Sequence, residues 1–196
     1  MLRTGFCWVV AAVLTLPLFA CERDPLGVDC PEVSVGGLVI TEVRGDQDGG
    51  ADDQGEWIEL FNASGATIDL VGLRLVMKTL NGSSEEDFTI RGPLSVPNSG
   101  YATFGRFPEG EEPPHISYGY ATELDTGINT TGAIEVIACG IEIDQVVYQT
   151  LPGAGTLAFD GSLAPDATAN DSEANFCVDA TDAGEGSPQQ ENPPCT

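Results

Sequence analysis

Two short segments decide the fold of this chain: Leu-Val-Ile-Thr-Glu-Val at residues 38–43 and Trp-Ile-Glu-Leu-Phe at residues 57–61. Their side chains alternate with a period of two, which predicts β-strands. In the first segment, the alternation assigns to one face Val39, Thr41 and Val43, and to the other Leu38, Ile40 and Glu42. An acidic, glycine-rich stretch at 44–55 separates the two segments, so we expect adjacent strands joined by a loop.

The same rhythm of short strands and turns continues along the chain. Further strands are expected at 67–70, 73–79, 87–90, 101–104, 133–138, 142–148 and 157–159. The strands at 133–138 and 142–148 flank Cys139-Gly140 as in a hairpin. No stretch combines helical apolar spacing with capping residues, so we expect almost no helix. From Asp160 onward the chain is small and polar, with few residues able to pack. Many short strands separated by turns predict one all-β domain, an antiparallel β-sandwich or barrel.

The charge balance excludes one class of partner. The 196 residues include 31 Asp and Glu against 7 Lys and Arg, a net charge of -24. A nucleic-acid backbone would be repelled by such a surface, so no nucleic-acid partner is expected. The chain is nevertheless 41% hydrophobic, which is enough to bury a core.

The first residues are typical of an export signal. Arg3 precedes an apolar run at 6–18, which is too short to span a bilayer. Leu-Phe-Ala-Cys at 18–21 resembles the lipobox of bacterial lipoproteins, which implies a lipid on Cys21 and attachment to a membrane of the bacterial cell envelope. The alternative is an ordinary secretory signal cut near Ala20, which leaves Cys21 as a plain thiol.

Four cysteines remain after Cys7 and Cys21, and their even number predicts disulfides in an exported chain. Zinc is a poor alternative, because the chain has no CxxC pair and its one histidine is His115. Of the three possible pairings we favour the one that joins the two ends of the folded region, since domain termini often lie close together. It pairs Cys30 with Cys195 and Cys139 with Cys177.

The order of several motifs resembles the lamin tail domain found in bacterial exported proteins. The likeness covers the segments 38–43, 56–62, 68–75, 97–105, 127–136 and 143–148, and the closing Gly186-Ser187-Pro188 with Asn192. This resemblance implies an immunoglobulin-like β-sandwich of the lamin tail type and no enzymatic activity. The implied organisation is a signal peptide at 1–20, a tether at 21–36, the sandwich at 37–192 and a C-terminal end at 193–196.

The acidic loop is the candidate metal site. Calcium takes six to eight oxygen ligands, and the loop offers Asp46, Asp48, Asp52, Asp53 and Glu56. It is not an EF-hand, because counting from Asp46 puts Ala51 and Trp57 where glycine and glutamate are required. The alternative, which we favour, is a solvated connection between two strands, with no cofactor.

Three other features of the sequence bear on possible chemistry. Glu42 and Glu59 face each other if the first two strands pair, an arrangement that glycosidases use. Glutamates in such a sandwich are more often exposed or hydrogen-bonded to nearby backbone, so we expect no catalysis. His115 is interpreted as a surface-loop residue, and Trp57 as a packing residue rather than a ligand platform.

The sequence thus predicts a non-enzymatic binding or structural module, held on the membrane through Cys21 and recognising an unidentified protein or glycan. Its negative charge favours basic partners or divalent cations. The alternative is a calcium-dependent adhesion or carbohydrate-binding module that uses the acidic loop at 46–56.

Overall fold

A computed structural model describes residues 30–48, 52, 54–181 and 186–196, and the fold is almost entirely β. Cys21 and the expected signal peptide lie outside these residues. Within them, no helix is long and apolar enough to cross a membrane. The elements are β1 (Leu38–Arg44), β2 (Trp57–Asn62), β3 (Ile68–Asp69), β4 (Arg74–Lys78), β5 (Glu85–Thr89), β6 (Ser95–Val96), β7 (Tyr101–Gly105), β8 (Tyr118–Gly119), β9 (Gly132–Ala138), β10 (Ile141–Tyr148), β11 (Thr156–Phe159), the 3-10 turn η1 (Glu173–Asn175) and β12 (Phe176–Asp179).

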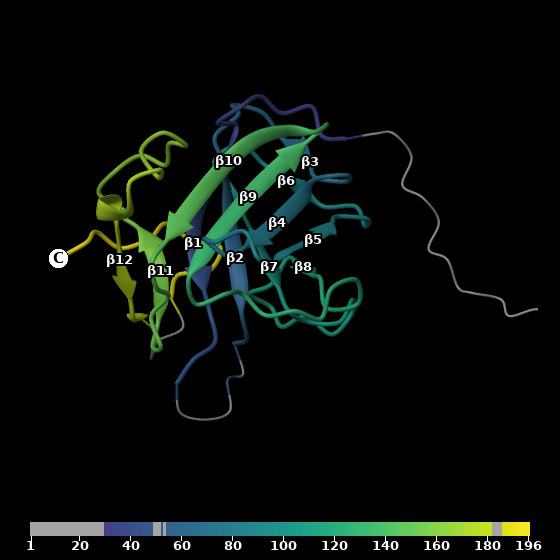
Figure 1. The fold of residues 1–196 in the computed structure, drawn as a ribbon. Coiled ribbons are helices and arrows are strands. Elements are labelled where there is room, and N and C mark those ends of the chain that lie inside the picture. Colours follow the sequence, from purple (N-terminus) through teal and green to yellow (C-terminus); the bar gives the residue numbers. More distant parts are fainter. Residues whose placement is uncertain (1–29, 49–51, 53, 182–185) are drawn as a thin grey trace, which may run out of the picture.

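The strands form an antiparallel β-sandwich, which confirms the predicted fold class. One sheet has the order β12-β11-β1-β2-β7-β8, and the other has the order β10-β9-β4-β5. Strands β3 and β6 make a small third sheet, and the β7–β8 pair is parallel. The second sheet lies across the first in Figure 1, and one apolar core fills the space between them. Core side chains from both sheets include Leu38, Ile58, Leu60, Leu75, Ile134 and Val146.

Each strand expected from the sequence has an observed counterpart. The predicted hairpin is formed by β9 and β10, with Ala138 opposite Ile141. Cys139 and Gly140 both have positive φ, 51° and 75°, which a two-residue type I′ turn requires. The strands missed from the sequence are β6, β8 and β12, two of which are only two residues long.

A β-bulge in β1 makes the predicted alternation wrong beyond Ile40. The register with β2 shifts between Ile40 and Glu42, so Thr41 is an extra residue. A bulge of one residue turns every following side chain to the opposite face. Val43 therefore joins Leu38 in the core, whereas Glu42 leaves the core face and lies opposite Glu59.

The predicted disulfide pairing is also wrong, although all four cysteines are bonded. Cys30 is joined to Cys139, and Cys177 to Cys195. The prediction assumed that the two ends of the folded region meet. Instead, the segment from Cys30 runs beside β10, where Gly36 N–H donates to Ile143 O at 2.8 Å. The C-terminus lies against β11 and β12 on the other side of the sandwich (Figure 1).

This pairing predicts unequal effects of removing the two disulfides. Cys30 and Cys139 are 109 residues apart and Cys177 and Cys195 are 18 apart. By loop-closure entropy, double alanine substitution should lower the free energy of unfolding by about 5 kcal/mol for the first pair and about 3 kcal/mol for the second. Denaturant unfolding of the full chain measures this difference. Mass spectrometry of a non-reduced digest checks the connectivity, and a Cys30–Cys195 peptide would contradict it.

Candidate functional site

Two glutamates lie directly opposite each other at the centre of the six-stranded sheet. Glu42 on β1 is paired in register with Glu59 on β2, and neither side chain is exposed to solvent. Both point away from the core, because Val43 and Ile58, their neighbours along the strands, belong to it. The pair predicted from the sequence is therefore formed, but it is completely buried.

Hydroxyl and backbone groups satisfy both carboxylates. Glu42 accepts a short hydrogen bond from the Thr156 hydroxyl and another from Ser187 N–H at 3.2 Å, and its second oxygen lies 3.4 Å from Ser187 Oγ. Glu59 accepts from the Thr41 hydroxyl at 2.8 Å and from Gln189 N–H at 2.5 Å. All four carboxylate oxygens thus have a hydrogen-bonding partner, as buried polar groups require.

The C-terminal segment, defined here as residues 186–192, covers the glutamate pair. Asn192 fastens its end: the side-chain Nδ2 donates to Thr41 O and to Phe159 O, both at 2.9 Å, and Oδ1 accepts from Ser187 Oγ at 2.9 Å. At its start, Gly186 has φ of 80°, and a Cβ there would lie 2.5 Å from a Glu42 oxygen. The segment approaches so closely that glycine is required at this position.

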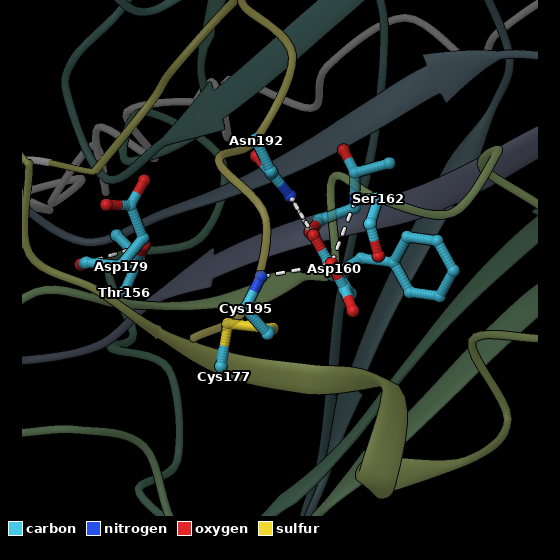
Figure 2. Close-up of a disulfide and its surroundings, with 9 residues drawn as sticks. Thr156, Asp160, Ser162, Cys177, Asp179, Asn192 and Cys195 are labelled. Atoms are coloured by element: carbon cyan, nitrogen blue, oxygen red, sulfur yellow. Dashed lines mark hydrogen bonds between the residues drawn. A yellow bond between two sulfur atoms is a disulfide. The ribbon is translucent and has the colours of Figure 1, made fainter.

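The Cys177–Cys195 disulfide holds the chain just beyond this segment. In Figure 2, Asp160 lies between Cys195 and Ser162, whose N–H groups donate to its Oδ1 at 3.0 and 2.9 Å. Gly161 N–H also donates to Pro193 O at 3.2 Å. The polar chain end is therefore fixed by hydrogen bonds and a disulfide.

Burial raises the pKa of both glutamates in the pair. The pKa of Glu42 is raised to about 7, because removal from water and, to a smaller extent, the nearby Asp179 outweigh the hydrogen bonds from Thr156 and Ser187 that lower it. Burial also raises the pKa of Glu59 well above its usual value, and the charge of Glu42 adds to this rise. The pair keeps protons at pH values at which exposed glutamates are ionised.

This arrangement suits attachment better than catalysis. A glycosidase needs one carboxyl to reach the leaving group and another to reach the sugar ring or a water molecule. Here every carboxylate oxygen is already hydrogen-bonded beneath the C-terminal segment, and neither glutamate is exposed. The hydrogen bonds tie residues 186–192 to the centre of the sheet.

A further buried acid, Asp144 on β10, was missed in the sequence. Its Oδ2 accepts from Ile40 N–H at 2.6 Å and from Asn170 Nδ2 at 2.7 Å, and Asn170 Nδ2 also donates to Ile40 O at 3.0 Å. Burial raises the pKa of Asp144 to about 7, against the hydrogen bonds that lower it. The partners are 104 and 26 residues away, so no local motif marks them.

The described acids of the predicted calcium loop have different surroundings. Asp52 pairs with the buried Arg44 at 2.6 Å. Glu56 pairs with Arg106 at 3.2 Å and accepts a short hydrogen bond from Ile128 N–H. The other described acids of the loop, Asp46 and Asp48, are exposed, and Asp53 lies outside the described residues.

No group of three or more His, Cys, Asp or Glu side chains that could hold a metal ion is found in the described part of the chain. The calcium interpretation stays a prediction, since part of the loop is not described.

The remaining candidates have structural surroundings. Trp57 is completely buried, as expected for a packing residue. His115 Nε2 lies 3.0 Å from Gln54 O, and its ring meets the Phe107 ring edge-on with centroids 6.4 Å apart. Among the residues that close over the glutamates, Ser187 and Asn192 had one sequence signal, the closing motif of the lamin tail resemblance. Thr156 and Gln189 had none.

Comparison with known proteins gives no further guide: no protein-family model and no curated protein matches this chain.

The buried acids predict that stability falls as the pH rises towards neutrality. For Glu42, Glu59 and Asp144 the folded pKa lies above the unfolded value of about 4, so the folded state binds more protons. Their contribution to stability is complete below pH ~4 and is lost as the pH rises towards about 7, by up to about 1.4 kcal/mol per pH unit for each titrating group. Denaturant unfolding of the full chain between pH 4.5 and 8 measures the slope.

Matched variants separate this effect from the general charge of the protein. Glu42→Gln removes one buried titration, so the slope should become shallower and stability at pH 8 should rise. Glu111→Gln removes the same charge from an exposed loop and should leave the slope unchanged. Stability that increases from pH 5 to 8 in the unaltered chain would contradict the predicted direction.

Proposed function

We propose that this chain is a lipid-anchored protein of the bacterial cell envelope whose lamin-tail-like sandwich acts as a non-catalytic binding or structural module. The observation that carries the proposal is the closure of the Glu42–Glu59 pair by the C-terminal segment. The two carboxyls that most resembled a catalytic pair fasten the fold and are not presented to a substrate. Fold alone assigns no activity, so the geometry of this site carries the proposal.

The positions of the motifs support the lamin-tail-like assignment. The segments 38–43 and 56–62 fall on the paired β1 and β2, and 97–105 falls on a turn followed by β7. The segment 143–148 falls on β10. The closing motif, Gly186-Ser187-Pro188 with Asn192, falls where the C-terminal segment seals the sheet. Motifs far apart in sequence thus meet in one β-sandwich.

The proposed anchor sets how far the sandwich extends from a membrane. Cys30 is fixed to the sandwich by its disulfide to Cys139. The nine residues from Cys21 to Cys30 reach at most about 30 Å, even if fully extended. A module so tethered would act close to the lipid surface that carries it.

Lipidation is tested with the full chain produced in a Gram-negative bacterium supplied with a radiolabelled fatty acid. We expect label on the protein and its recovery in the membrane fraction. Cys21→Ala should abolish both, because acyl chains anchor a protein through their buried methylenes. Cys7→Ala, the matched control within the leader, should change neither. A Cys21→Ala variant that keeps label and membrane association would overturn the proposed anchor.

The second candidate is the calcium-dependent adhesion or carbohydrate-binding module. The observation in its favour is that Asp46 and Asp48 are exposed on one loop. Thermal unfolding of the full chain, with millimolar calcium and then with EDTA, distinguishes the candidates, because a ligand of the native state must stabilise it. A calcium-specific rise in midpoint that Asp46→Ala with Asp48→Ala removes would favour adhesion. An equal effect of magnesium would favour the solvated loop.

A further inference from the structure

A cavity of about 480 Å³ opens on the outer face of the six-stranded sheet, next to the C-terminal segment. Phe61 on β2 and Tyr101 on β7 line it together with residues 161–165 and Glu191. Its volume lies within the range of about 300–1,000 Å³ that is usual for ligand pockets. Nothing in the fold described above accounts for this cavity.

The two aromatic rings form an open surface in the cavity. Phe61 and Tyr101 are directly paired across β2 and β7, with ring centroids 5.1 Å apart and planes tilted by 57°. Both are partly exposed and neither belongs to the apolar core. An aromatic pair left uncovered beside a concave surface is a common feature of binding sites.

The charge around the rings is negative. Of the described residues that line the cavity, Glu191 alone is charged, and its side chain is exposed. The pKa of Tyr101 is raised to about 12, mainly by burial and in part by the carboxyls of Glu59 and Glu191. The whole chain carries a charge of -24. An anionic ligand would be repelled here, whereas a cation would be attracted by the ring faces and by the carboxylate.

The walls of the cavity are held in place before any ligand arrives. Asp160 fixes residues 161–165 through Ser162 N–H, which donates to its Oδ1 at 2.9 Å, and Leu163 N–H, which donates to its carbonyl at 2.9 Å. Asn192, next to Glu191, is bonded to Phe159 O and Thr41 O. Such preorganisation lowers the entropic cost of binding.

We propose that this cavity binds a lysine or arginine side chain of a basic partner protein, with the cation against Phe61 and Tyr101 and paired with Glu191. The inference deepens the proposed function, because it rests on the chain acting as a binding module and names the chemistry of its partner. A sugar could also stack on the rings, but it would gain nothing from the negative charge. Binding of a saccharide in place of a cationic side chain is therefore one of the outcomes that the test distinguishes.

The test measures binding of a fluorescent tetralysine peptide to the full chain in a polyoxyethylene detergent, which offers neither sugar nor choline groups. Fluorescence anisotropy at 0.15 M salt gives the dissociation constant. We expect Tyr101→Leu and Glu191→Gln each to weaken binding by roughly threefold to tenfold, as loss of a cation–π contact or an ion pair predicts. Both substitutions are outside the core, and circular dichroism confirms folding.

The controls separate the cavity from general electrostatic attraction. Glu111→Gln removes the same charge as Glu191→Gln at an exposed site away from the cavity, and it should change the dissociation constant less than about twofold. A peptide whose lysines are acetylated should not bind. Equal effects of Glu111→Gln and Glu191→Gln would overturn the proposal, as would binding of maltohexaose but not tetralysine.

These results are independent of the anchor. Loss of peptide binding at the cavity would refute the proposed ligand and leave lipidation on Cys21 intact. Failure of lipidation would remove the envelope location without affecting peptide binding.

Discussion

The burial of two acidic side chains in the middle of one sheet is the constraint on which the rest of this structure depends. Glu42 and Glu59 lie side by side, away from solvent, in a protein that already carries a large negative charge. Burying a carboxyl without partners costs far more than any single hydrogen bond returns, so donors must be brought to it. Those donors come from Thr41 nearby and from Thr156, Ser187 and Gln189, which are more than a hundred residues further along the chain.

The need for these donors explains why the C-terminal region is held in a defined position. Its residues contribute little to the apolar core, yet Asn192 bonds two strands and the Cys177–Cys195 disulfide joins β12 to the chain end. The bonds of Asn192 also hold the neighbouring Glu191 at the edge of the aromatic cavity. The closure of the glutamate pair and the position of Glu191 at the cavity therefore both depend on Asn192. A change in the pair would be expected to reach the cavity through the C-terminal segment.

Sequence reasoning succeeded where the signal is local. The alternation in 38–43 and 57–61, the turn at Cys139-Gly140 and the absence of helical spacing correctly predicted the strands, the hairpin and the class of fold. It failed where one extra residue reverses the orientation of all later side chains in a strand. The bulge at Thr41 places Val43 and Glu42 on the faces opposite to those predicted. It also failed for the disulfides, since pairing depends on which loops lie side by side. Phe61 and Tyr101 each resembled an ordinary strand aromatic, and only their pairing across β2 and β7 shows the open surface.

The sequence by itself determined the all-β architecture, because period-two patterning is a local signal that acts over a few residues. It also determined the acidic charge and the capacity for two disulfides, because both follow from composition. The sequence also indicated that Glu42 and Glu59 face each other, since adjacent strands of this kind pair antiparallel. Tertiary structure alone decided what the pair does. Whether the two carboxyls contact a substrate or the C-terminal segment depends on where residues 186–192 lie. That position is set by bonds between segments more than a hundred residues apart, which no local pattern encodes.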